Sequence, residues 1–213
     1  MSDLQIAQQL QDQYDGSTPL KNTAGVAYSI VASDYVIDLM FRGTSDLEDA
    51  KRDLEAGMIS TAFGQLHRGA WSGLLEVFST EEMNLPKNKP IRISGHSLGA
   101  MRASMAANIL SQKGWTMLEC VTFGCPLWGD SFAVNNLNYV KNRTYQNYHN
   151  LFEHDFFTSI PIYLPSEPYA APPNRIQVWS APTAHNEWHD APYNIQCHSL
   201  KDCYIQALEK MNG

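Results

Sequence analysis

A serine stands between two closely spaced glycines in the pentapeptide Gly95-His96-Ser97-Leu98-Gly99. A short run with strand character, residues 89–94, comes before it, and a stretch rich in Ala and Met with a helical pattern, residues 98–112, follows. A G-x-S-x-G sequence between a strand and a helix is typical of a nucleophile elbow, in which the glycines let the two elements pass closely and the serine hydroxyl points outward. The sequence therefore predicts that Ser97 is a nucleophile in a sharp turn; the alternative is an ordinary tight turn.

Apolar runs with strand character alternate with helical patterns along the rest of the chain. Ser33 and Asp34 separate two such runs, which is typical of a hairpin. Ser45 and Glu48 form a capping box before apolar residues at helical spacing, which predicts a helix that runs to Met58. The expected strands are residues 25–30, 35–42, 89–94, 117–123, 144–152 and 175–180, and the expected helices include a short one near the start, 98–112 and 200–211. This order predicts an α/β fold with a mostly parallel central sheet and helices on both faces.

The composition excludes several classes of protein. The chain has 213 residues with 15 basic and 22 acidic side chains, a formal charge of -7, and no cluster of Lys and Arg of the kind that binds nucleic acid. No run reaches about 18 apolar residues and residues 1–20 lack the apolar core of a signal peptide, so we expect no transmembrane segment and, by default, a cytoplasmic location. Neither a repeat nor a linker divides the chain, so we expect a single domain over residues 1–213.

A second segment offers the hydrogen-bond donors that acyl transfer requires. The Phe-Arg-Gly-Thr sequence that ends at Thr44 stands where the second strand of the expected hairpin stops. There Thr44 would offer its N–H and its hydroxyl, and Leu98 would offer the N–H at the start of the helix after the serine. Donors fixed at that place stabilise the negative oxygen of a tetrahedral intermediate. Thr44 and Leu98 are therefore the predicted oxyanion hole.

Five segments form a combination that is far more specific than any one of them. They are Phe41-Arg-Gly-Thr44, His67-Arg-Gly69, Gly95-His-Ser-Leu-Gly99, Val121-Thr-Phe-Gly-Cys-Pro126 and a later His-Asp segment. Together they resemble the class 3 lipase family, the fungal-type triacylglycerol lipases and related esterases. The resemblance implies an α/β-hydrolase fold, with Ser97 as the nucleophile and Thr44 and Leu98 as the oxyanion hole. It also places a lid helix after Thr44, where Ala50 stands in place of a usual Trp, which implies a smaller and more polar lid.

The acid of a catalytic triad should follow the serine in the chain, because a nucleophile elbow has the order serine, acid, histidine. By the resemblance, the acid lies in a loop after a strand and shortly before a Pro-containing turn. Asp155 fits, because it follows the expected strand 144–152 and precedes Pro161. Asp130 and Glu153 are the alternatives.

The same chain order leaves three histidines as candidates for the base. His198 stands directly before the last expected helix, in a His-Ser-Leu-x-x-x-Tyr setting similar to the histidine segment of the family. His198 is therefore the predicted base, and its role would be to take the proton of the serine hydroxyl while the acid fixes its tautomer. His189 is the main alternative and His185 the other.

The segment His185-Asn-Glu-Trp-His189 invites interpretation as a metal site. A zinc protease motif needs Glu next to one of the two histidines, whereas Glu187 stands in the middle here. Pro182 and Pro192 also argue against the helix that would align the two imidazoles. We therefore expect no metal and no other cofactor.

These residues predict a serine carboxylic-ester hydrolase that cleaves acyl esters, such as acylglycerols, through an acyl-serine intermediate. The net charge disfavours adsorption to anionic lipid surfaces, and the expected lid is heavily charged, so we expect neutral esters with short or medium acyl chains and at most transient contact with a lipid surface. The alternatives are a phospholipase A1 or a feruloyl-type esterase. A catalytically silent member of the fold that serves as a binding module is the alternative from another class of protein.

Overall fold

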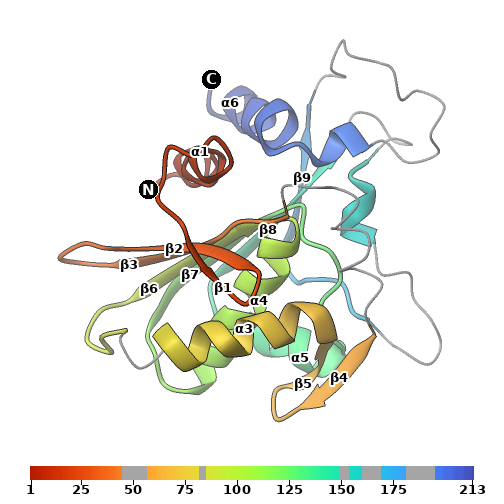
Figure 1. Cartoon of the computed structure of the whole chain (residues 1–213). Coiled ribbons are helices and arrows are strands. Elements are labelled where there is room, and N and C mark those ends of the chain that lie inside the picture. Colours follow the sequence, from red (N-terminus) through yellow and green to blue (C-terminus); the bar gives the residue numbers. More distant parts are fainter. Residues whose placement is uncertain (45–56, 82–84, 149–153, 160–168, 181–194) are drawn as a thin grey trace.

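A mixed sheet of seven strands runs through the middle of the protein (Figure 1). Its strand order is β1-β2-β3-β6-β7-β8-β9, and β4 and β5 form a separate hairpin. The computed structural model describes residues 1–44, 57–81, 85–148, 154–159, 169–180 and 195–213. The strands are β1 (Lys21–Thr23), β2 (Val26–Ala32), β3 (Ile37–Phe41), β4 (Met58–Thr61), β5 (Gly64–His67), β6 (Ile91–His96), β7 (Met117–Phe123), β8 (Asn142–Tyr148) and β9 (Arg175–Trp179). The helices are α1 (Asp3–Tyr14), α3 (Arg68–Glu81), α4 (Leu98–Gln112), α5 (Ser131–Asn136) and α6 (Gln206–Asn212), with short helical turns η2 (Leu137–Tyr139), η3 (Phe156–Ser159), η4 (Ile195–His198) and η5 (Leu200–Ile205).

The parallel strands end at one edge of the sheet. β1, β2 and β3 are antiparallel neighbours, whereas β3, β6, β7, β8 and β9 run parallel. Phe41 pairs with Gly95, His96 pairs with Phe123, and Phe123 pairs with Tyr145, so the ends of four strands are level with one another. The segments that follow these strands converge on this edge, which is where ligands bind in open α/β sheets.

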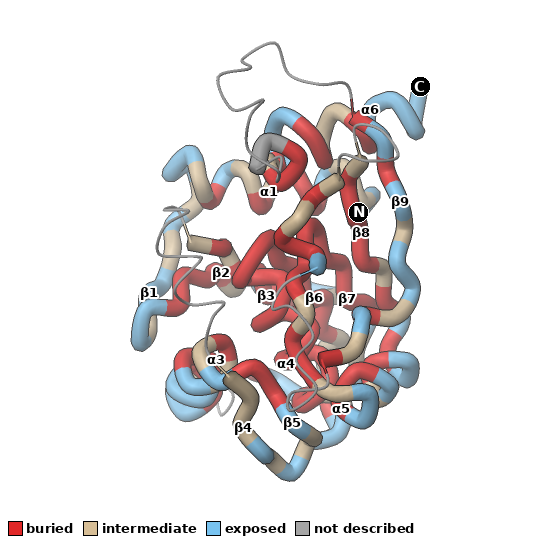
Figure 2. Tube along the Cα trace, turned by 90° about the vertical axis from the view of Figure 1, so that its right-hand side faces the viewer, coloured by how far each residue is buried: buried red, intermediate tan, exposed pale blue. Residues whose placement is uncertain are grey.

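Helices cover both faces of the sheet. α1 and α6 lie on one face, and α3, α4 and α5 lie on the other, so the strands between them are buried (Figure 1, Figure 2). α4 is buried on nearly every side, which explains why most of its residues are apolar or small. α1 buries one stripe, Ile6, Ala7, Leu10 and Gln13, and a fully buried aliphatic side chain such as Leu10 stabilises the fold by about 1.5–3 kcal/mol. The core therefore has two layers, one on each side of the sheet.

A ladder of buried charges crosses the opposite edge of the sheet. Arg92 contacts Asp38 at 2.5 Å and Glu119 at 3.7 Å, and Glu119 contacts Arg143 at 2.9 Å. Arg143 then binds both carboxylate oxygens of Asp3, in the first turn of α1. Burial would raise the pKa of Asp3, but the bonds from Arg143 outweigh it and hold that pKa below its usual value. The ladder fixes α1 to the sheet through a two-pronged ion pair.

The structure confirms the predicted fold class and most of the predicted elements. It has an α/β fold with a mostly parallel sheet and helices on both faces. β7 and α4 have the predicted bounds, and the predicted hairpin is β2 and β3, which pair through Ala32 and Ile37. The predicted strand 144–152 is described as far as Tyr148. The helix expected near the start is α1, which opens with a capping box of Ser2 and Gln5.

One predicted helix has a wrong end, because Met58 opens β4 and so does not belong to the helix predicted to run to it. The last predicted helix, residues 200–211, corresponds to η5 and α6, and Met211 near its end is 59% exposed. The capping box of Ser45 and Glu48, and the expected lid with Ala50, lie outside the described residues.

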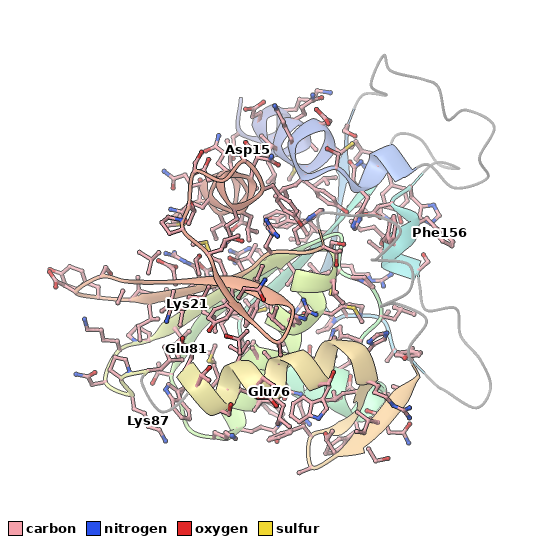
Figure 3. All side chains as sticks on the ribbon, viewed as in Figure 1. Asp15, Lys21, Glu76, Glu81, Lys87 and Phe156 are labelled. Carbon is pink, nitrogen blue, oxygen red and sulfur yellow. The ribbon has the colours of Figure 1, made fainter. Side chains whose placement is uncertain are left out.

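Four elements have no counterpart in the prediction: β1, the β4–β5 hairpin, α3 and α5. β1 and α3 are joined by an ion pair in which Nζ of Lys21 lies 2.6 Å from a carboxylate oxygen of Glu81 (Figure 3). His67 begins α3 as a cap, because its Nδ1 accepts the N–H of Ala70 at 3.3 Å. None of the described helices combines the length and the apolar character needed to cross a membrane.

Candidate active site

Ser97 lies in the sharp turn between β6 and α4. Its backbone has φ 59° and ψ -132°. A conformation of this kind costs a residue other than glycine about 1–3 kcal/mol. Close packing holds the turn, because a Cβ on Gly95 would lie 2.3 Å from the carbonyl oxygen of Gly99, and a Cβ on Gly99 would lie 2.2 Å from that of Phe41. The predicted strand, turn and helix are confirmed, and both glycines are needed because the elements touch.

The segment after β3 passes directly beside this turn. A Cβ on Gly43 would lie only 2.8 Å from Cβ of Ser97, so the two backbones are in contact. Thr44 is the next residue, and Leu98 is the first residue of α4. The N–H groups in the first turn of a helix have no acceptor within the helix, so that of Leu98 can bind a ligand oxygen. The two residues predicted for the oxyanion hole thus lie close to Ser97 on different elements.

Asp155 is fully buried and held by three donors. Nδ1 of His198 lies 2.8 Å and 2.9 Å from its two carboxylate oxygens. The hydroxyl of Tyr204 donates to Oδ2 at 2.5 Å, and the N–H of Phe157 donates to Oδ1 at 3.0 Å. Asp155 directly precedes η3, whose first residue, Phe156, is labelled in Figure 3. Three donors satisfy a buried carboxylate in its ionised form.

The bond to Asp155 fixes the tautomer of His198. A carboxylate only accepts, so Nδ1 carries the proton, and in the neutral ring Nε2 then has a lone pair. That Nε2 is buried and has no hydrogen-bond partner among the residues that the structure describes. The ring packs against Phe157 with centroids 4.3 Å apart. His198 is therefore oriented as a base, with one nitrogen held and the other able to accept a proton.

The end of β7 lies between the serine and the Asp155–His198 pair. The N–H of Ser97 donates to the carbonyl oxygen of Phe123 at 3.1 Å. A Cβ on the next residue, Gly124, would lie 2.8 Å from Oδ2 of Asp155 and 2.9 Å from Nδ1 of His198. The end of β7 thus passes close to all three residues predicted for the triad. The structure brings Ser97, Asp155 and His198 to the same edge of the sheet.

The alternatives for the acid and the base do not lie at this centre or are not described. Asp130 caps α5, and its carboxylate accepts the N–H groups of Ala133 and Gln65. This local bonding gives Asp130 a structural role. Glu153, His189 and His185 lie outside the described residues.

Tyr204 belongs to the site, although no sequence pattern assigns it a role there. It lies within the last predicted helix, and its hydroxyl accepts the N–H of Asn147 at 3.2 Å and donates to Asp155. Burial, and then the charge of Asp155, raise the pKa of Tyr204 well above its usual value, so it remains a donor. A buried tyrosine needs a partner for its hydroxyl, and its place six residues after the predicted base was the available signal.

Within the described ranges, no three residues among His, Cys, Asp and Glu are grouped so that they could hold a metal ion. The segment that holds His185 and His189 is not among them.

The fold and the arrangement of this edge define an α/β-hydrolase. The triacylglyceride lipase of Rhizomucor miehei superposes with a TM-score of 0.63 at 17% identity, over 84% of this chain and 78% of that one. Lipase II of Rhizopus niveus gives 0.60 at 18% identity, over 76% and 64%. A lipase of Yarrowia lipolytica gives 0.57 at 18%, over 70% and 61%. At such identities the superpositions establish the fold.

The sequence profile of one family, described as lipase (class 3), matches residues 29–164, which is more than half of the chain. The chain therefore belongs to the class 3 lipase family and is a carboxylic-ester hydrolase of the lipase type. Ser97 and Asp155 lie within the matched region, whereas α1 and the segment from His198 onward lie outside it. A search of curated protein sequences found no match.

Proposed function

We propose that this hydrolase cleaves neutral acyl esters with Ser97 as nucleophile, His198 as base and Asp155 as the acid that orients the base. The observation that carries the proposal is the free, buried Nε2 of His198, combined with its Nδ1–H held by Asp155. A buried nitrogen without a partner costs about 1–3 kcal/mol, which a purely structural histidine would avoid. A base that must take a proton from a serine during reaction needs that lone pair free.

This arrangement supports a reaction in two steps through an acyl-serine. Nε2 of His198 takes the proton of the Ser97 hydroxyl while Oγ bonds to the ester carbonyl carbon, and the resulting oxyanion accepts the N–H groups of Thr44 and Leu98. The bond to the alcohol then breaks, and the imidazolium returns the proton to the departing oxygen. Water attacks the acyl-serine by the same route and releases the carboxylic acid. Asp155 stays ionised throughout and stabilises the imidazolium.

The choice of substrate rests on charge. The net charge of -7 repels anionic surfaces, whereas a neutral ester meets no such repulsion. We expect the highest rates on neutral esters with short or medium acyl chains. A phospholipase A1 and a feruloyl-type esterase use the same chemistry and differ in the group that they recognise.

The test is a series of p-nitrophenyl esters of increasing acyl length, run on the wild type and Ser97→Ala. We expect Ser97→Ala to lose hydrolysis by several orders of magnitude, and a fluorophosphonate to label the wild type alone. The matched control is Ser104→Ala, which removes another buried serine hydroxyl, on α4, and should retain both activities. Hydrolysis by Ser97→Ala at the wild-type rate would refute the triad.

Faster hydrolysis of a phosphatidylcholine or of methyl ferulate than of the neutral esters would leave the triad standing but refute the substrate class. So would a rate that rises only for long acyl chains and jumps when the ester forms an emulsion. If the folded wild type showed neither hydrolysis nor labelling, the chain would be a silent member of the fold.

A further inference from the structure

A tyrosine of the first helix reaches the catalytic centre from outside the matched family region. Tyr14 is the last residue of α1, and its hydroxyl oxygen lies 3.0 Å from the backbone nitrogen of Gly43 and 2.9 Å from Nδ1 of His96. Gly43 precedes Thr44, and His96 precedes Ser97. One hydroxyl therefore contacts the neighbour of an oxyanion residue and the neighbour of the nucleophile.

His96 continues this chain of bonds to the base. Its Nε2 lies 2.8 Å from the backbone carbonyl oxygen of His198, and the two imidazole centroids are 4.7 Å apart. The ring of Tyr14 meets the ring of His96 edge-on at 5.6 Å, and that of Tyr204 lies 6.2 Å away on another side. His96 is thus enclosed by rings and bonded at both nitrogens.

The positions of the protons in these hydrogen bonds follow from which groups can only donate or only accept. A carbonyl oxygen only accepts, so Nε2 of His96 carries a proton. Burial, and then the charge of His198, lower the pKa of His96 well below its usual value, so the ring is neutral and Nδ1 has a lone pair. Tyr14 therefore donates its hydroxyl proton to Nδ1, while its oxygen accepts the N–H of Gly43. Burial raises the pKa of Tyr14, so it keeps that proton.

The contact at Gly43 leaves no space for an alternative arrangement. A Cβ there would lie 2.7 Å from the hydroxyl oxygen of Tyr14 and 2.7 Å from the carbonyl oxygen of His96. The three residues are packed against one another at the level of the backbone. A shift of any of them would move the others.

We infer that Tyr14 is a positioning residue, which holds the oxyanion segment, the nucleophile turn and the base in one geometry through Gly43, His96 and His198. The inference rests on the proposed function, because it assigns the three segments their catalytic roles. Tyr14 acts on catalysis only through these neighbours. A displacement of about 1 Å in an active site lowers rates by up to about 100-fold, so such positioning has a measurable effect.

The first variant is Tyr14→Phe, which keeps the ring and removes the hydroxyl. We expect kcat on a p-nitrophenyl ester to fall by about 10- to 100-fold with little change in KM, and fluorophosphonate labelling to slow in parallel. Active sites are counted by the burst of p-nitrophenol, so that loss of folded protein does not enter kcat. The matched control is Tyr28→Phe, which removes a tyrosine hydroxyl bonded to Glu81 and should keep the wild-type kcat.

The second part is a double-mutant cycle with His96→Gln, which keeps a donor for the carbonyl of His198. If Tyr14 acts through His96, the fold-loss of kcat in the double variant is much smaller than the product of the two single fold-losses. The reason is that either single change already breaks the series of hydrogen bonds. A structural role of Tyr14 that is independent of His96 would give losses that multiply. That result, or a wild-type kcat in Tyr14→Phe, would overturn the inference.

Failure of the proposed function has a different signature. Hydrolysis that persists in Ser97→Ala, or a wild type without hydrolysis, refutes the triad and the role of Tyr14 with it. The role of Tyr14 alone is refuted if the wild type is active, Ser97→Ala is inactive and Tyr14→Phe has an unchanged kcat.

Discussion

Protonation of His96 should contribute to unfolding of the protein in acid. The ring is buried and neutral, and its pKa lies well below the value of 6.5 that a histidine has in an unfolded chain. Below about pH 6.5 the unfolded chain therefore binds a proton that the folded chain excludes. The contribution of His96 to the free energy of unfolding is complete above that pH and is lost as the pH falls toward the lowered pKa of the folded state.

The magnitude follows from the proton linkage. If the folded ring stays neutral throughout, moving from about pH 7.5 to about pH 5.5 removes about 1.4 kcal/mol from the free energy of unfolding. For a chain of this length that corresponds to a fall of roughly 3–6 °C in Tm. Other groups that titrate in this range also change the free energy of unfolding with pH. Their contributions are the same in the wild type and in a variant that lacks only His96.

The assay is urea unfolding at both pH values for the wild type and His96→Gln. The variant is expected to be less stable at neutral pH, but its loss between the two pH values should be smaller than that of the wild type by about 1.4 kcal/mol. An equal loss in the wild type and His96→Gln would refute the neutral, buried state of this ring.

Three further substitutions probe the supports of the site. Tyr204→Phe should lower the free energy of unfolding by about 1–3 kcal/mol and reduce kcat, because Asp155 loses a buried donor; unchanged stability and kcat would count against that role. Gly99→Ala should destabilise by about 3 kcal/mol in urea unfolding, because the new Cβ would meet the carbonyl oxygen of Phe41; a wild-type midpoint would contradict the close contact. Asp38→Asn should cost about 3–5 kcal/mol, since it leaves a buried arginine without its nearest carboxylate; a cost below about 1 kcal/mol would show that the ladder is solvated.

The turn at Ser97 was predictable because its signals are local. The two glycines, the apolar strand before them and the Ala-rich helix after them lie within one continuous stretch, and each specifies the same geometry. The bounds of β7 could be read in the same way, because a strand buried on both faces is a continuous apolar run. The fold class followed from the order of such elements.

The supports of the site were not predictable, because they depend on contacts between distant parts of the chain. Tyr14 and His96 are 82 positions apart, and nothing near Tyr14 in the sequence distinguishes it from other tyrosines on a mostly polar helix. The hydroxyl of Tyr204 meets Asp155 across 49 positions. The charge ladder has the same character, since each of its residues is an unremarkable polar position within its own strand or, for Asp3, its own helix. The lid expected after Thr44 remains a prediction.

The placement of the two ends of the chain has a consequence for biosynthesis. α1 is synthesised before the other described elements, yet its apolar stripe packs in the same layer as the side chains of η5 and α6, which are synthesised after them. The elbow at Ser97 can form early, but the proposed base and Tyr204 emerge only with residues 195–213. A nascent chain that stops before them would have the proposed nucleophile without the proposed base. We therefore expect ester hydrolysis only from chains that extend past Tyr204, and no hydrolysis from shorter products.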